Sequence, residues 1–210
     1  IYDVNGNLTK TIAGYRKHGS YTREGTKFFV NGRDNNGIYS AGGTVTINGN
    51  TVGGVTFNLS TDNSNYWPYL GNQRYYYDSS SRNNNGIFMN GGTANVNYAT
   101  FNINSSGTGM LMSGNSTGTV TGGTFNVNSG DGIYINTGSS ITDVNDVDFN
   151  VAGSSNGIYA TTGSTLTQVR GTSHFNITGK NSNGILKDTT NNTTVSNSTF
   201  DVNGAGSTGI

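Results

Sequence analysis

The acidic residues that lie closest together in this sequence are Asp143, Asp146 and Asp148, and Asp131 precedes the first of them by 12 residues. Carboxylates at such spacing could bind calcium. Carboxylates in pairs, or beside an arginine, also cleave polysaccharides in β-helical enzymes, and Arg170 lies one sequence repeat later. The group matches neither the EF-hand loop nor the repeat of calcium-binding β-rolls. We therefore expect a solvated turn without a metal, with a lyase or hydrolase site as the alternative.

Other groups suited to catalysis are scarce. The only glutamate is Glu24, and His18 and His174 lie in different regions, where we expect them at the surface. The chain has no cysteine, which excludes a disulfide framework and a thiolate metal site. We expect a protein that is not an enzyme and that has no metal and no cofactor.

A different set of residues suits recognition, and it lies in residues 60–84. This stretch holds five of the 12 tyrosines, the only tryptophan and the only proline. Rings beside arginine suit carbohydrate or protein recognition, because they offer large apolar faces with polar groups attached. The alternative is a segment that folds back near Tyr39 and Phe88 and hides its own rings. The predicted ligand-binding residues are Tyr66, Trp67, Tyr69, Arg74, Tyr75, Tyr76, Tyr77 and Arg82.

The rest of the chain is a repeat that must position these residues. One recurring phrase is Phe-Asn-Val, and from Phe101 onward its copies are 24, 24, 26 and 25 residues apart. Its copies are Phe57-Asn58-Leu59, Phe101-Asn102-Ile103, Phe125-Asn126-Val127, Phe149-Asn150-Val151, Phe175-Asn176-Ile177 and Phe200-Asp201-Val202. A second phrase, Gly-Ile-aromatic, follows each copy. Its copies are Gly37-Ile38-Tyr39, Gly86-Ile87-Phe88, Gly109-Met110-Leu111, Gly132-Ile133-Tyr134, Gly157-Ile158-Tyr159, Gly184-Ile185-Leu186 and Gly209-Ile210.

A valine about five residues before each phenylalanine completes the repeat. The valines are Val52, Val96, Val120, Val144, Val169 and Val195. Each repeat thus reads as three short strands separated by turn residues, which is the pattern of a solenoid. The sequence predicts an all-β fold, a three-sided parallel β-helix with about 24–25 residues per rung. Crossover chirality predicts that it is right-handed.

Alternation along the strands predicts which side chains face inward. The phenylalanines, valines and isoleucines face the interior, because the positions between them are mostly asparagine. The residue after each inward Ile or Met then points outward, which predicts an exposed stripe of Tyr39, Phe88, Leu111, Tyr134, Tyr159 and Leu186. The stripe either stiffens the sheet or forms a docking surface.

Composition and charge set the domain boundaries. Residues 1–34 are irregular and carry a net charge of +3, which indicates a polar cap over the end of the core or, alternatively, a patch for anionic glycans. Residues 35–210 form the rungs, and the chain ends on the opening of a further repeat, so we expect a piece of a longer protein. The whole chain has zero formal net charge, which disfavours nucleic-acid binding. No apolar run is long enough to span a membrane.

The rungs, such as Asn156-Gly157-Ile158-Tyr159 with Phe175-Asn176-Ile177, resemble the passenger domains of bacterial autotransporter adhesins of the self-associating type. The resemblance covers about residues 28–210. It implies a right-handed β-helix at the bacterial cell surface or outer membrane, or secreted, that binds host glycans, extracellular-matrix proteins or sister cells. We expect a non-catalytic adhesin. The alternatives are a polysaccharide-degrading β-helix enzyme of the lyase, hydrolase or tailspike kind, and a self-association module for cell–cell aggregation.

Overall fold

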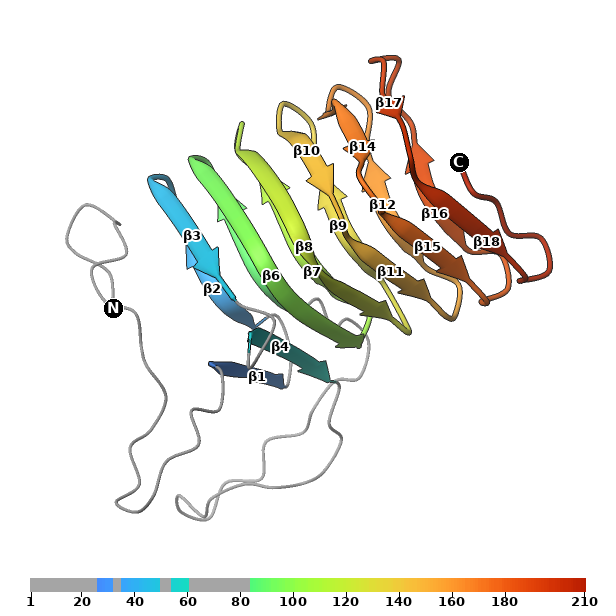
Figure 1. The fold of residues 1–210 in the computed structure, drawn as a ribbon. Coiled ribbons are helices and arrows are strands. Elements are labelled where there is room, and N and C mark those ends of the chain that lie inside the picture. Colours follow the sequence, from blue (N-terminus) through green and yellow to red (C-terminus); the bar gives the residue numbers. More distant parts are fainter. Residues whose placement is uncertain (1–25, 32–34, 50–53, 61–83) are drawn as a thin grey trace, which may run out of the picture.

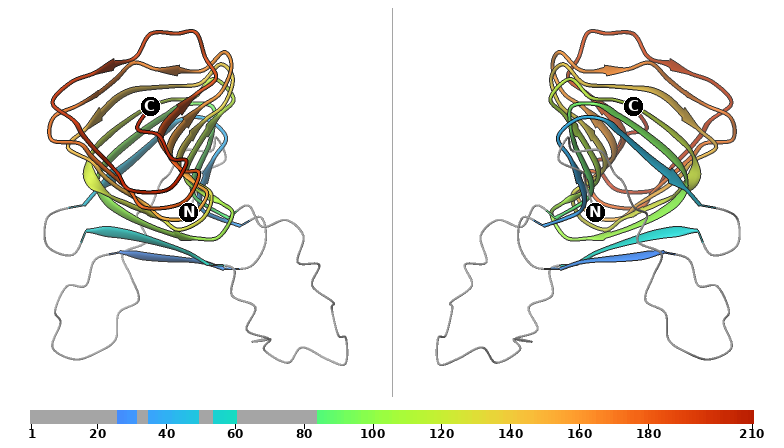
Figure 2. Two further views of the ribbon diagram at one scale, coloured as in Figure 1. Left: turned by 90° about the vertical axis from the view of Figure 1, so that its right-hand side faces the viewer. Right: turned by 90° about the vertical axis from the view of Figure 1, so that its left-hand side faces the viewer.

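The computed structural model describes residues 26–31, 35–49, 54–60 and 84–210. In these ranges every regular element is a β-strand, and the strands pair in parallel. They stack as a β-solenoid of about six turns (Figure 1). Viewed from either end, the coloured turns lie over one another around a shared interior (Figure 2). The predicted all-β parallel β-helix is confirmed.

One side of the solenoid is a six-stranded sheet built from the Gly-Ile-aromatic phrases, here called the Gly-Ile sheet. Each turn contributes one strand to it. The strands are β2 (Asn36–Ser40), β5 (Asn85–Asn90), β7 (Thr108–Ser113), β9 (Asp131–Ile135), β12 (Asn156–Ala160) and β16 (Asn183–Lys187).

The other two sides belong to a 12-stranded sheet that bends along its length. Its Val face contains β3 (Thr44–Asn48), β10 (Ser140–Asn145), β13 (Thr165–Leu166), β14 (Gln168–Arg170) and β17 (Thr194–Val195). Its Phe face contains β1 (Lys27–Asn31), β4 (Val55–Ser60), β11 (Asp148–Val151), β15 (His174–Ile177) and β18 (Thr199–Val202). The long strands β6 (Thr93–Asn104) and β8 (Thr117–Val127) run through both faces.

A residue with left-handed backbone lies at the corner between the Val and Phe faces in the last five turns. The φ angles run from 51° to 71° at Tyr98, Gly122, Asp146, Gly171 and Asn197. This conformation turns the chain without an additional loop, so β6 and β8 continue around the corner. Glycine, asparagine and aspartate tolerate it, whereas a bulky residue such as Tyr98 is strained there.

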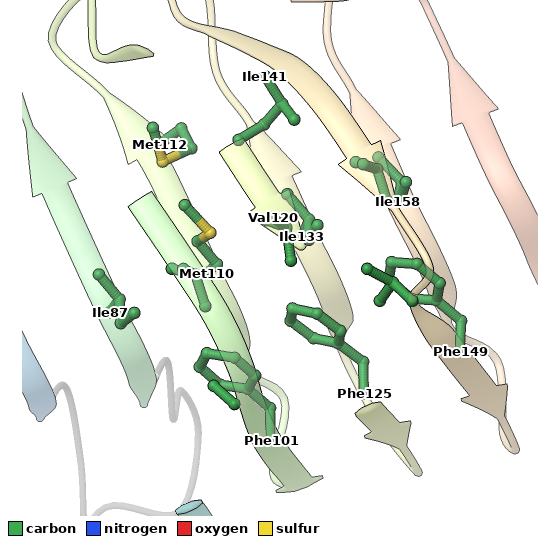
Figure 3. Close-up of a cluster of buried hydrophobic side chains, with 14 of the residues drawn as sticks. Ile87, Phe101, Met110, Met112, Val120, Phe125, Ile133, Ile141, Phe149 and Ile158 are labelled. Atoms are coloured by element: carbon green, nitrogen blue, oxygen red, sulfur yellow. The ribbon is translucent and has the colours of Figure 1, made fainter. Parts of the chain in front are cut away.

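The interior is organised in columns of similar apolar side chains, and one column consists of phenylalanine alone. Phe57 pairs in register with Phe101, Phe101 with Phe125, and Phe149 with Phe175. Neighbouring rings are nearly parallel, and their centroids are 4.5 to 5.0 Å apart from Phe28 to Phe200. Figure 3 shows part of this column beside the inward Ile and Met side chains of the Gly-Ile sheet. The predicted Phe column is confirmed.

The glycine of each Gly-Ile phrase is required by the closeness of the turns. A Cβ atom on Gly86, Gly109 or Gly132 would lie 2.4 to 2.7 Å from the carbonyl oxygen of the glycine in the next turn. A Cβ atom and an oxygen cannot approach so closely. Glycine is therefore required at this position, because the backbones of successive turns are in contact there.

The first turn adds a strand within the N-terminal stretch and contains a correction. Phe28 pairs with Phe57, so β1 extends the Phe face into residues 1–34. The predicted Val52, however, is not the partner of Val96, because Ile47 pairs with Val96. Val52 lies outside the described residues, as do residues 1–25 and 32–34 of the proposed N-terminal cap.

Candidate functional site

The eight predicted ligand-binding residues fall outside the part of the chain that the structure describes, so they stay a prediction. They are Tyr66, Trp67, Tyr69, Arg74, Tyr75, Tyr76, Tyr77 and Arg82. The strands on either side of them are described. Between β4 and β5 lie 24 residues, whereas only three lie between β6 and β7. The additional residues therefore enter at the corner between the Phe face and the Gly-Ile sheet.

Asn84 ties together the two ends of this segment. Its side chain is fully buried, and its Nδ2 atom donates a hydrogen bond to the carbonyl oxygen of Ser60 at 3.1 Å. Its Oδ1 atom accepts a hydrogen bond from the backbone N–H of Asn35 at 3.0 Å. The described residues on either side of 61–83 are thus held together at one point, beside the preceding turn.

A second, smaller insertion lies in the same turn, and its position explains the wrong assignment of Val52. Six residues separate β3 from β4, whereas Tyr98 alone fills the equivalent gap between Asn97 and Ala99. The two insertions lie at opposite ends of β4. Next to β4, the ring of Phe29 is 70% exposed. The sequence signal for this insertion is the spacing of ten residues from Ile47 to Phe57, against five from Val96 to Phe101.

The predicted outward stripe is a continuous column on the Gly-Ile sheet. Register joins its members in the order Tyr39, Phe88, Leu111, Tyr134, Tyr159 and Leu186. Tyr39 is 43% exposed, and the other five are partly exposed. Two pairs meet edge to face: Tyr39 with Phe88 at 5.2 Å, and Tyr134 with Tyr159 at 5.1 Å. Such pairs stabilise the sheet and still leave ring surface to a partner.

Polar columns border the stripe on both sides. The column at the start of the strands consists of Asn36, Asn85, Thr108, Asp131, Asn156 and Asn183. The column after the stripe consists of Asn90, Ser113, Asn136, Thr161 and Asp188. In the first column, asparagine amides donate hydrogen bonds to the preceding turn, as Asn183 does to Asn156 at 2.8 Å.

Asp131 is the one acidic residue in the first polar column. Its Oδ1 atom accepts a hydrogen bond from Nδ2 of Asn156 at 2.7 Å. Burial raises the pKa of the Asp131 carboxyl, and the bond from Asn156 offsets this only in part. Its ionised form is therefore less stable here than in water.

Asp188, in the second polar column, accepts a hydrogen bond from a tyrosine of the stripe. The hydroxyl of Tyr159 donates a hydrogen bond to its Oδ2 atom at 2.6 Å. This bond raises the pKa of Tyr159 to about 12, with smaller contributions from burial and from the charges of Asp188 and Asp131. Both carboxylates therefore act on one phenol.

The raised pKa of Tyr159 predicts a pH dependence of stability. Between the ordinary tyrosine pKa of about 10 and about 12, the unfolded chain loses this proton and the folded chain keeps it. The stabilisation is thus complete below pH 10 and is lost as the pH rises through this window. In a titration of tyrosinate absorbance, Asp188→Asn is expected to return one late-titrating tyrosine towards the ordinary pKa. Tyr159→Phe identifies that tyrosine, and identical curves for wild type and Asp188→Asn would contradict the assignment.

The acidic residues that suggested a lyase or hydrolase site do not form one cluster in the structure. Arg170 binds Asp143 with two hydrogen bonds, from Nε to Oδ1 at 2.9 Å and from Nη2 to Oδ2 at 2.7 Å. Asp146 accepts hydrogen bonds from the backbone and hydroxyl of Thr172, and these bonds lower its pKa. Asp131 lies on the Gly-Ile sheet instead. These carboxylates hold turns together, and they do not converge on one place.

Two segments, 114–118 and 153–157, match the Gly-x-Ser-x-Gly pattern of hydrolases. Their serines, Ser116 and Ser155, are buried in turns between strands. The hydroxyl of Ser116 donates to backbone carbonyl oxygens of Ser113 and Met89. A hydrolase elbow instead exposes its serine between a strand and a helix. The pattern here follows from turn composition.

The described residues contain no group of three or more His, Cys, Asp or Glu side chains placed to hold a metal ion. They also contain no helix of the length and hydropathy needed to cross a membrane.

Comparison of the chain with models of protein families, with curated proteins and with solved structures finds no match. The site must therefore be interpreted from its own geometry.

Proposed function

We propose that this chain is part of a cell-surface adhesin that binds host glycans or extracellular-matrix proteins without catalysing a reaction. The outward stripe is the observation that carries the proposal. It is a column of rings and aliphatic side chains, bordered by amides and hydroxyls, on a rigid rod. Surfaces that combine apolar rings with hydrogen-bonding groups are suited to recognition.

The two insertions support the same proposal. Departures from a regular scaffold are where binding segments are placed, and both insertions leave one turn at the ends of β4. The hydrogen bond between Asn84 and Ser60 brings together the two described ends that flank residues 61–83. We place the eight aromatic and arginine residues of that segment in the ligand contact.

The proposal includes a bacterial origin and secretion as an autotransporter passenger, with the chain at the cell surface or released from it. This part rests on the resemblance of the rungs, because β-helical passengers share the rung pattern. A β-solenoid of about six turns is compatible with it.

Self-association is the second candidate, and the Asn column of the Phe face favours it. Asn102 donates to Asn58 at 2.8 Å, and Asn126 donates to Asn102 at 2.8 Å. Each amide nitrogen keeps a second N–H for a partner. Two copies could pair through such columns, and this would produce aggregation between cells that display the protein.

Replacing Tyr66, Trp67, Tyr69 and Tyr75 together by alanine is expected to abolish adhesion and leave the fold intact. We expect these rings to supply contact area, and the core of the described part of the chain is formed by other side chains. The measurement is binding of the purified chain to immobilised glycans and matrix proteins, with circular dichroism as the fold check. Tyr98→Ala is the control, because Tyr98 is an exposed tyrosine, at 47%, at the corner between the Val and Phe faces. Undiminished adhesion by the folded quadruple variant would reject this segment as the site.

A further inference from the structure

We propose that Tyr134 and Tyr159, with the polar side chains beside them, bind an uncharged hexose-based glycan that lies along the solenoid axis. The inference rests on the proposed function, since it names the ligand class of an adhesive surface. It goes further by assigning a ligand class to named residues of the outward stripe, apart from the contacts proposed for residues 61–83.

The two tyrosines give the site its apolar part. They lie on adjacent strands, β9 and β12, with ring centroids 5.1 Å apart and an interplanar angle of 86°. Both are partly exposed on the outer side of the sheet. The C–H face of a pyranose ring packs on an aromatic ring through dispersion and the hydrophobic effect.

Hydrogen-bonding groups flank both rings. Asp131 and Asn156 lie at the start of the two strands and are bonded to each other at 2.7 Å. Asp188 lies beyond Tyr159 and accepts a hydrogen bond from its hydroxyl. Carboxylates accept and amides both donate and accept, so together they match the hydroxyls of a sugar.

Asp131 also differs in residue type from its neighbours in the first polar column, which supports a ligand contact. The equivalent residues in adjacent turns are Thr108 and Asn156. Asparagine at this position would continue the amide column without a partly buried carboxylate. A partly buried carboxylate whose ionised form is disfavoured, beside exposed rings, is typical of a functional residue.

Charge selects an uncharged glycan over an anionic one. The carboxylates of Asp131 and Asp188 both raise the pKa of Tyr159, so their fields overlap at its phenol. Lys187 is the basic residue of β16, and its Nζ atom donates to the carbonyl oxygen of Asn191 at 2.7 Å. A sulfate or uronate would meet two like charges here, which disfavours binding.

The repeat of the stripe suits a chain of sugars. Successive turns are about 4.8 Å apart, which is close to the length of one hexose unit. Leu111 precedes the tyrosine pair and Leu186 follows it. A glycan along the axis would thus meet one apolar side chain for each sugar.

The test is isothermal titration of the whole chain with cellohexaose and mannohexaose as uncharged probes and a heparin hexasaccharide as the anionic probe. We expect binding of an uncharged probe, weakened about tenfold or more in Tyr134→Ala and in Tyr159→Ala. Asp131→Asn is expected to weaken the same binding without loss of folding. The Tyr98→Ala variant is expected to bind as wild type, because Tyr98 is exposed and lies away from the Gly-Ile sheet.

Several results would overturn the inference. These are preference for heparin, wild-type affinity in both tyrosine variants, or a dimer of the chain that either tyrosine substitution abolishes in ultracentrifugation. If the wild-type chain binds a matrix protein or an anionic glycan but neither uncharged probe, this inference fails and the adhesin proposal stands. If it binds no glycan and no matrix protein, the adhesin proposal fails as well.

Discussion

Phe125→Ala is expected to lower the free energy of unfolding by about 3–5 kcal/mol. The Phe125 side chain is fully buried and stacks on Phe101 at 4.5 Å and on Phe149 at 5.0 Å. Alanine would leave a cavity between two rings that cannot close it, because the spacing of the turns is fixed by backbone hydrogen bonds. The loss also divides the column, so each half has fewer neighbouring turns to stabilise it.

Chemical denaturation followed by circular dichroism measures this effect, and Phe29→Ala is the matched control. Phe29 lies on β1, its ring is 70% exposed, and its removal is expected to change stability by less than about 0.5 kcal/mol. Equal losses in the two variants would show that the phenylalanines of the repeat do not form the core.

Gly132→Ala is expected to lower the free energy of unfolding by about 3 kcal/mol or more. A Cβ atom there would lie 2.4 Å from the carbonyl oxygen of Gly157 and 3.3 Å from ring carbons of Phe149. Relief requires that two turns separate, which breaks hydrogen bonds of the Gly-Ile sheet.

Gly42→Ala separates this crowding from ordinary backbone strain. Gly42 has a φ of 126°, and a Cβ atom there would meet nothing within 4 Å. Its replacement is expected to cost about 1 kcal/mol. If Gly132→Ala lowers the free energy of unfolding no more than Gly42→Ala does, the turns do not approach each other closely at Gly132.

The sequence predicted the fold well because the columns repeat at a nearly constant interval. Phe101, Phe125 and Phe149 each sit at one position of a turn, so their spacing reports the register directly. The same logic predicted the outward stripe. Tyr134 and Tyr159 follow an inward Ile, and alternation alone directs them outward.

Two features were not predicted. Val52 has the usual distance to Phe57, yet the strand position belongs to Ile47, because an insertion lengthens the spacing from Ile47 to Phe57 to ten residues. The continuous strands β6 and β8 depend on a left-handed residue at the corner, and Tyr98 is an unexpected residue type for it.

The candidate site could not be predicted from the sequence, because it depends on contacts between residues of different turns. The bond from Asn156 to Asp131 joins residues 25 positions apart, and that from Tyr159 to Asp188 joins residues 29 positions apart. No local motif marks such pairs. The two carboxylates beside the stripe became visible only when the turns were stacked.

The placement of every proposed surface depends on one claim, that successive repeats stack coaxially in register. The chain has no cysteine, so pairs can be introduced cleanly. Thr100 and Thr124 are register partners on adjacent turns, whereas His174 lies two turns beyond Thr124. The Cα atoms of register partners are about 4.8 Å apart, which a disulfide can bridge, and Thr100 and His174 are about 14 Å apart, which it cannot.

The decisive measurement is disulfide formation under mild oxidation, read by mass spectrometry of the intact chain. The double variant Thr100→Cys with Thr124→Cys is expected to form an internal disulfide almost completely. The double variant Thr100→Cys with His174→Cys is expected to form none. Equal cross-linking of the two pairs, or cross-linking of the second alone, would contradict the stacked register.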